Sequence, residues 1–170
     1  MNLFLRLLLL LFTSSFRPRC DALGPARKRF IVWPADLDVL WHVNNGVYLS
    51  MLDVARVDLM LRSGALRRLR RHGFYPVVAA ETIRFRRSLR LLQSFEVETT
   101  VIGWDDKAFL IRHHFTRADE LVAEAVVRVR FLKRRGGSVS SQEVLALLDK
   151  PGPSPPLPSW IDAWNLENAR

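Results

Sequence analysis

Three segments in the second half of the chain alternate apolar and polar residues with a period of two. They span residues 95–104, 108–117 and 121–133, and two short polar stretches, WDDK at 104–107 and RADE at 117–120, join them. Alternation of this kind is typical of strands with one buried face, and turns this short connect antiparallel neighbours. The pattern therefore predicts three consecutive antiparallel strands.

Residues 44–63 have the composition of a helix that is buried on most sides. Asn44 or Asn45 is a suitable N-cap, and Gly64 is a suitable stop. The polar positions of the first half form one narrow stripe at i, i+3 and i+6: Ser50, Asp53 and Arg56. A helix with so little polar surface must be wrapped by other elements rather than laid on a surface.

Two further strands are predicted before the alternating segments, at residues 28–34 and 77–87, with Pro34 ending the first. The fold class expected from this order is α+β, an antiparallel sheet curled around one long central helix. We divide the chain into a hydrophobic and basic N-terminal segment (1–27), a core domain (28–148) and a proline-rich tail (149–170). The tail ends in a short helix that Ser159 is expected to cap.

Composition narrows the class of protein. The chain has 170 residues, 49% hydrophobic and 25% charged, which excludes a disordered chain and a multi-span membrane protein. One cysteine, Cys20, excludes an internal disulfide and a cysteine metal cluster. The net charge of +9 favours anionic partners: nucleic acid, acidic lipid, or the phosphates of coenzyme A (CoA) or a carrier protein.

The N-terminal apolar run, residues 3–12, is about half the length that a membrane-spanning helix needs. Arg17 and Arg19 follow it, and no small-residue cleavage site is evident, so we do not expect secretion. We expect a short helix that either packs on the domain or makes peripheral membrane contact. The predicted location is cytoplasmic, with membrane association left open.

The stretch DLDVLWHVNN at residues 36–45 places two carboxylates, a histidine and two asparagines immediately before the buried helix. With Tyr48 it forms the pattern D-x-D…H-V-N-N-x-x-Y. This pattern, followed by four strands, resembles the hotdog-fold acyl thioesterases, in particular the thioesterase-like (THEM-type, 4-hydroxybenzoyl-CoA thioesterase-like) subgroup. The resemblance covers about residues 28–135.

The resemblance implies a hydrolase that acts on acyl-CoA or acyl-carrier-protein substrates and uses no cofactor or metal. It implies Asp38 as general base or nucleophile and the backbone near Asn45 as the oxyanion site, which agrees with the free N–H groups and positive dipole of a helix N-terminus. A homodimer or higher homo-oligomer is implied as well, because the acyl pocket of this fold usually forms between subunits. The residues to which we assign roles are Asp38, His42 and Asn45 (catalytic) and Asn44, Tyr48 and Trp41 (substrate-binding).

Two positions depart from the family pattern. Leu40 stands where plant acyl-carrier-protein thioesterases have an asparagine that orients water, and Trp41 stands where many relatives have glycine. These departures keep open an alternative, a catalytically silent acyl-binding protein at a membrane surface. The hydratase branch of the fold is not expected, because His42 follows Asp38 by four residues and no Asn-Pro pair occurs.

Each assigned residue also has a structural interpretation. Asp38 can cap a loop, His42 can be a hydrogen-bonded structural histidine, and the side chains of Asn44 and Asn45 can serve as ordinary helix caps. Asp53 is interpreted as an ion-pair partner of Arg56 rather than a second catalytic carboxylate.

Adjacent histidines and clustered arginines suggest two further kinds of site, and we expect neither. His113 and His114 face opposite sides of a strand and cannot share a metal. The arginine clusters at 67–73, 84–90 and 133–135 lack a nucleic-acid-binding motif. We therefore expect a solvated basic surface, and nucleic acid is not an expected partner.

Overall fold

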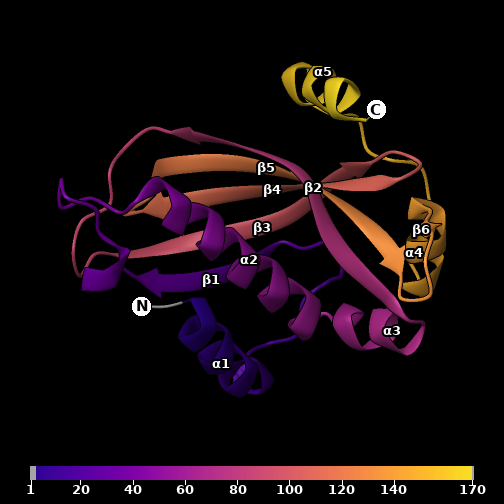
Figure 1. Cartoon of the computed structure of the whole chain (residues 1–170), viewed down its shortest axis with the longest axis horizontal. Helices are drawn as coiled ribbons and strands as arrows, with labels where there is room; N and C mark the ends of the chain where they lie inside the picture. Colours follow the sequence, from indigo (N-terminus) through magenta and orange to yellow (C-terminus); the bar gives the residue numbers. More distant parts are fainter. Residues whose placement is uncertain (1–2, 170) are drawn as a thin grey trace.

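One antiparallel sheet curls around the helix α2 in the computed structural model, which describes residues 3–169 (Figure 1). The order of its main strands is β1-β3-β4-β5-β2, and β6 pairs with β5. The strands are β1 (Ala26–Ile31), β2 (Phe74–Phe85), β3 (Ser94–Trp104), β4 (Ala108–Arg117), β5 (Glu120–Lys133) and β6 (Ser138–Val139). The predicted curled sheet and its hairpins are therefore confirmed.

The first strand ends earlier than predicted. It stops at Ile31, and Pro34 opens a short 3-10 helix, Pro34–Asp36, rather than closing the strand. Proline suits the first turn of such a helix because its ring fixes φ and the missing N–H would have no partner there. This early turn gives the chain room for the loop that carries the polar cluster.

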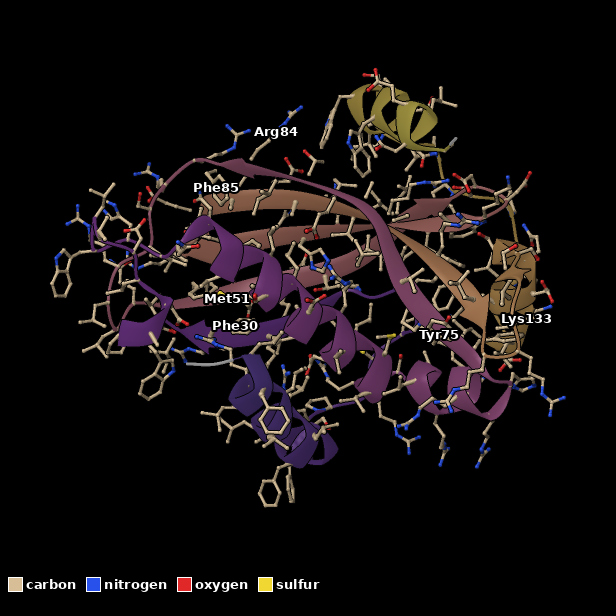
Figure 2. The ribbon with its side chains drawn as sticks, in the orientation of Figure 1. Phe30, Met51, Tyr75, Arg84, Phe85 and Lys133 are labelled. Atoms are coloured by element: carbon tan, nitrogen blue, oxygen red, sulfur yellow. The ribbon has the colours of Figure 1, made fainter. Side chains whose placement is uncertain are left out.

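The central helix α2 (Asn45–Arg62) begins and ends where its sequence signals predict. The Asn44 side chain accepts a hydrogen bond from the Gly46 N–H at 2.9 Å, and Gly64 continues the chain at φ +75°. Its buried positions lie between the sheet on one side and the N-terminal segment on the other: Tyr48, Met51, Leu52, Val54, Ala55, Arg56, Asp58 and Leu59. Figure 2 shows Met51 of α2 and Phe30 of β1 inside this core.

The short helices cover the edges of the domain. They are α1 (Leu3–Thr13), α3 (Ala65–Arg71), α4 (Ser141–Leu147) and α5 (Ser159–Asn168). Helix α4 was not predicted, although Ser140 and Glu143 form a capping box at its start. The predicted Ser159 cap is wrong: Pro158 is the N-cap of α5, and no side chain caps this helix.

Helix α5 lies on the face of the sheet opposite to α2 (Figure 1). Ile161 packs there against Leu110 and Val126, and the buried Arg128 donates hydrogen bonds to Asn165 Oδ1 (2.9 Å) and Asp105 Oδ2 (2.7 Å). Arg128 thereby fixes the tail to the β3–β4 turn. Helix α2 therefore fills the concave face of the sheet, and α5 with the tail covers part of the outer face.

The N-terminal helix packs on the domain. Leu10 of α1 is fully buried in the core beside α2, whereas the outward positions Phe4, Leu8 and Phe12 are exposed. Across residues 3–169, every helix lacks the combination of length and apolar content that crossing a bilayer requires. Helix α1 thus packs on the domain through its inner face, and its outer face exposes large apolar side chains.

Candidate functional site

The loop between β1 and α2 carries the polar cluster in a closed conformation. Leu37 and Val43 form an isolated antiparallel bridge, and the Asp38 N–H donates to the His42 carbonyl at 2.8 Å. Trp41 takes the left-handed conformation (φ +61°) at the tip. The bridge brings the two ends of the loop together directly in front of the α2 N-terminus.

Asp38 is half-buried and organises this loop with one oxygen. Its Oδ1 accepts hydrogen bonds from the N–H groups of Leu40 (2.8 Å) and His42 (3.2 Å). Within residues 3–169 no side chain or backbone group donates to Oδ2. The carboxylate is therefore held in place, and one oxygen is left for solvent or a ligand.

Asp36, two residues earlier, has a different role. Its buried carboxylate forms an ion pair with Arg6 of α1 and accepts the Trp33 N–H at 2.8 Å. Its carbonyl accepts the Asn44 N–H at 2.9 Å. The first carboxylate of the pattern thus ties α1, the loop and the start of α2 together, and it is not available to a substrate.

The N-terminus of α2 faces the same loop. In the first turn, the Gly46 N–H donates to the Asn44 side chain and the Val47 N–H to the Asn44 carbonyl, both at 2.9 Å, while the Asn45 N–H has no acceptor within residues 3–169. The side chains of Asn44 and Asn45 are exposed. An anion near Asn45 would meet both a free N–H and the positive end of the helix dipole.

The remaining predicted site residues lie apart from one another. His42 is half-buried, and the Trp41 side chain is 71% exposed, as is most of Leu40 beside it. Tyr48 is buried in the core, edge-on to Phe85 (5.0 Å between ring centroids) and Phe115 (5.3 Å). Burial raises the pKa of the Tyr48 hydroxyl.

Strand β2 supplies one wall of that aromatic cluster. Phe85 packs on Tyr48, whereas its neighbour Arg84 points to the other side of the sheet and lies 4.1 Å from the Trp160 ring of α5 (Figure 2). Trp41 is thus exposed at the tip of its loop, whereas Tyr48 is buried in the core. The roles that we assign to these two residues stay predictions.

An apolar cavity of about 170 Å³ lies between the C-terminal half of α2 and the sheet. Its volume resembles that of an engineered protein cavity, about 150 Å³, that binds benzene. The residues that line it include Asp53, Arg56, Met60, Leu69, Phe109 and Phe131. Asp53 is eight residues beyond Asn45, about 12 Å along the helix axis, so the cavity and the loop are separate features.

The polar edge of this cavity was only partly predicted. Asp53 is half exposed and forms the expected ion pair with Arg56, but the Arg56 side chain is buried, and burial lowers its pKa. His113 on β4 is fully buried nearby, with Nδ1 3.0 Å from Thr99 Oγ1. Burial, together with the charge of Arg56, holds the pKa of His113 well below 6.5.

The signal for this inner polar cluster was present in the sequence. His113 occupies the same strand face as the core residues Phe109, Ile111 and Phe115, while His114 faces the other side and contacts Glu124 at 3.2 Å. The two rings thus diverge as predicted. In the part of the chain that the structure describes, no group of three metal-binding side chains comes together.

Comparison with known proteins gives a consistent result. The family model of the thioesterase-like superfamily matches residues 32–165. Protein THEM6 of Xenopus laevis is 37% identical over 134 residues, which are 79% of this chain and 64% of that protein. The chain therefore spans about two thirds of the length of this curated relative.

Solved structures share the fold. A probable thioesterase from Escherichia coli superposes with a TM-score of 0.68 at 23% identity, covering 73% of this chain and 96% of that one. An Asp-to-Asn variant of 4-hydroxybenzoyl-CoA thioesterase, complexed with 4-hydroxybenzoyl-CoA, gives a TM-score of 0.65 at 17% identity, covering 72% and 97%. The fold is the hotdog fold that the sequence pattern predicts.

Proposed function

Because the chain belongs to the thioesterase-like superfamily, we propose that it hydrolyses the thioester bond of an acyl-CoA or an acyl-carrier-protein substrate. The observation that carries this proposal is the arrangement of Asp38. One oxygen is fixed by two backbone N–H groups, and the other has no donor in the part of the chain that the structure describes, in a loop directly before the α2 N-terminus. Thioester hydrolysis needs such a carboxylate beside an oxyanion site.

In the proposed reaction, Asp38 Oδ2 removes a proton from a water molecule as that water attacks the thioester carbonyl carbon. The carbonyl oxygen becomes an oxyanion, which the Asn45 N–H and the positive end of α2 stabilise. When the C–S bond breaks, the proton held by Asp38 passes to the leaving thiolate. In the nucleophilic variant, Asp38 attacks the carbon itself and the C–S bond breaks, which releases the thiolate and leaves an anhydride. Water then hydrolyses this anhydride to the free acid and the Asp38 carboxylate, and the proton that is released goes to the thiolate.

Asp53 is the second candidate for the carboxylate. It is half exposed at the edge of the apolar cavity, where an acyl group of about one ring or six carbons would fit. Its ion pair with Arg56 reduces its availability as a base. We therefore rank Asp38 first and keep Asp53 as the comparison in every mutational test.

Thiol release from short, medium, long and aromatic acyl-CoA substrates tests the proposed activity. Hydrolysis of at least one substrate class, with saturation kinetics, supports it. The alternative, a silent acyl-binding protein, predicts acyl-CoA binding by calorimetry with no thiol release from any acyl-CoA or acyl-carrier-protein substrate. In that case the exposed Leu40 and Trp41 are the first residues to revert toward the family pattern.

A membrane-surface setting has an observation in its favour. The outward face of α1 exposes a row of large apolar side chains, and the exposed Arg19 follows it, whereas Arg17 is paired with the buried Asp58. Exposed apolar patches rimmed by cations suit an anionic lipid surface. Sedimentation with phosphatidylserine-containing vesicles tests this, and a Phe4→Ser/Phe12→Ser variant should lose the binding if α1 is the contact.

A homodimer is proposed on the basis of strand β2. It is a twelve-residue edge strand of the sheet, and its exposed side chains include Tyr75, Val78 and Phe85. An open edge of this length favours pairing with another strand. A second copy of the same edge would give a continuous sheet across two subunits.

A further inference from the structure

A groove of about 530 Å³ opens beside His42, at the candidate catalytic loop. Three different parts of the chain form it: the loop before α2, the β2–β3 connection and the β4–β5 turn. The residues that line it include His42, Arg87, Arg90, Gln93, Arg117 and Glu120. Three guanidinium groups therefore face one carboxylate, which leaves an excess of positive charge.

The backbone that carries two of these arginines is fixed. The N–H groups of Arg86 and Arg87 both donate to the Val122 carbonyl, at 2.8 and 3.1 Å. Leu89 is fully buried, and its carbonyl accepts the Val43 N–H at 2.9 Å, which joins this connection to the catalytic loop. The Arg90 N–H donates to Gln93 Oε1 at 3.0 Å. The arginines thus project from a rigid base rather than a free loop.

The guanidinium groups remain available for a ligand. Arg87 contacts Glu120 at 3.2 Å, but both side chains are more than half exposed, and ion pairs of this kind are weak. Arg90 and Arg117 have no carboxylate partner among residues 3–169. Planar guanidinium groups bind phosphate oxygens in a bidentate manner and are strongly favoured for this task.

We propose that this groove binds the phosphate groups of the CoA portion of the substrate, with Arg87, Arg90 and Arg117 as the ligands. The proposal rests on the thioesterase function and adds the site that holds the anionic end of the substrate. Glu120 opposes phosphate binding because it neutralises Arg87 and repels the anion.

A second arginine-lined groove provides a matched control. It is lined by residues of the α2–α3 junction, among them Arg62, Arg67, Arg70 and Arg71. It lies at the opposite end of α2, about 27 Å from the catalytic loop by the rise of 18 residues. If the variants act only through the net charge, substitutions in either groove should have the same effect on substrate binding. If the phosphate site lies beside His42, only substitutions in that groove should weaken binding.

The kinetic test compares two substrates with the same acyl group, the acyl-CoA and the acyl-N-acetylcysteamine thioester, which has no phosphate. We expect Arg87→Glu/Arg90→Glu to raise KM for the acyl-CoA at least about tenfold, since the loss of a single charge-assisted hydrogen bond already predicts that much, and to leave the truncated substrate unchanged. Arg67→Glu/Arg70→Glu, with the same change in charge, should alter neither. Glu120→Gln should lower KM for the acyl-CoA.

Equal effects of the two double variants, or an equal effect on both substrates, would overturn the proposal. A binding measurement separates this inference from the catalytic one. Adenosine 3′,5′-bisphosphate should bind the wild-type chain in calorimetry and lose about tenfold in affinity in Arg87→Glu/Arg90→Glu, whether or not any thioester is hydrolysed. If that variant instead loses only binding to phosphatidylserine vesicles, the groove holds lipid headgroups and the proposal is wrong.

Discussion

The carboxylates of Asp36 and Asp38, separated by one residue, lie in different environments. Asp36 is buried and paired with Arg6, whereas Asp38 is half-buried and one of its oxygens has no donor among residues 3–169. The sequence pattern alone cannot distinguish them, because the partner of Asp36 lies thirty residues earlier in the chain. The geometry therefore adds the reason why the second carboxylate, and not the first, is a candidate base.

The buried histidine predicts a pH dependence of stability. His113 has a pKa well below 6.5 in the folded protein, so below pH 6.5 the unfolded chain binds more protons than the folded one. The free energy of unfolding should fall as the pH drops below 6.5, by at most about 1.4 kcal/mol per pH unit from this group. Urea unfolding of His113→Gln between pH 5 and 7.5 should show that this contribution is lost.

His114→Gln is the control for that measurement. His114 is partly exposed and contacts Glu124, so its removal should leave most of the slope below pH 6.5 in place. Parallel pH profiles for wild type and His113→Gln would contradict the assignment of the slope to His113.

At the scale of elements, the strands and most of the helices were predictable from the sequence, and helix α4 was not. The period of two in β3, β4 and β5 follows from one face packing on α2, so local sequence reports it directly. Helix α4 has only seven residues, too few for a clear helical period. The predicted Ser159 cap of α5 is wrong because Pro158 occupies the N-cap position and Ser159 is already the first helical residue.

Parts of the candidate site were also predictable from the sequence, and other parts were not. The Asn44 cap, the Asp53–Arg56 pair and the divergence of the two histidines follow from spacing within one element. The apolar cavity and the arginine groove each need several elements that are distant in sequence. Spacing within one element carries no information about such arrangements.

Helix α1 should be held mainly by Leu10 and by the Arg6–Asp36 ion pair. Arg6→Met removes a charged hydrogen-bond donor from the buried Asp36 carboxylate and should cost about 2–3 kcal/mol in the free energy of unfolding. The double variant Arg6→Met/Asp36→Asn should recover part of this loss, because a neutral amide costs less to bury than a carboxylate. Urea unfolding of the two single variants and the double variant measures the coupling.

Phe12→Ser on the exposed face of the same helix is the control, and it should change the stability by less than about 0.5 kcal/mol. Additive losses in the Arg6 and Asp36 variants, with no recovery in the double variant, would mean that the ion pair does not hold α1.

For the whole molecule, the open β2 edge predicts self-association. Light scattering should give a mass about twice the 19.6 kDa of one chain. Tyr75→Glu/Val78→Glu places like charges on opposing strands of the proposed interface and should shift the mass toward one chain. A wild-type chain that stays monomeric at high micromolar concentration would rule out this interface.

Asp38 is the proposed catalytic carboxylate, and the most direct test of this role is the rate of thiol release by Asp38→Asn and Asp53→Asn on the best acyl-CoA substrate. Asparagine keeps the Oδ1 acceptor for Leu40 and His42, so the loop should stay folded. We predict that kcat falls at least about 100-fold in Asp38→Asn, with an unchanged melting temperature, and changes less than about tenfold in Asp53→Asn. A full rate in Asp38→Asn, or a loss confined to Asp53→Asn, would contradict the mechanism and move the reaction to the edge of the apolar cavity.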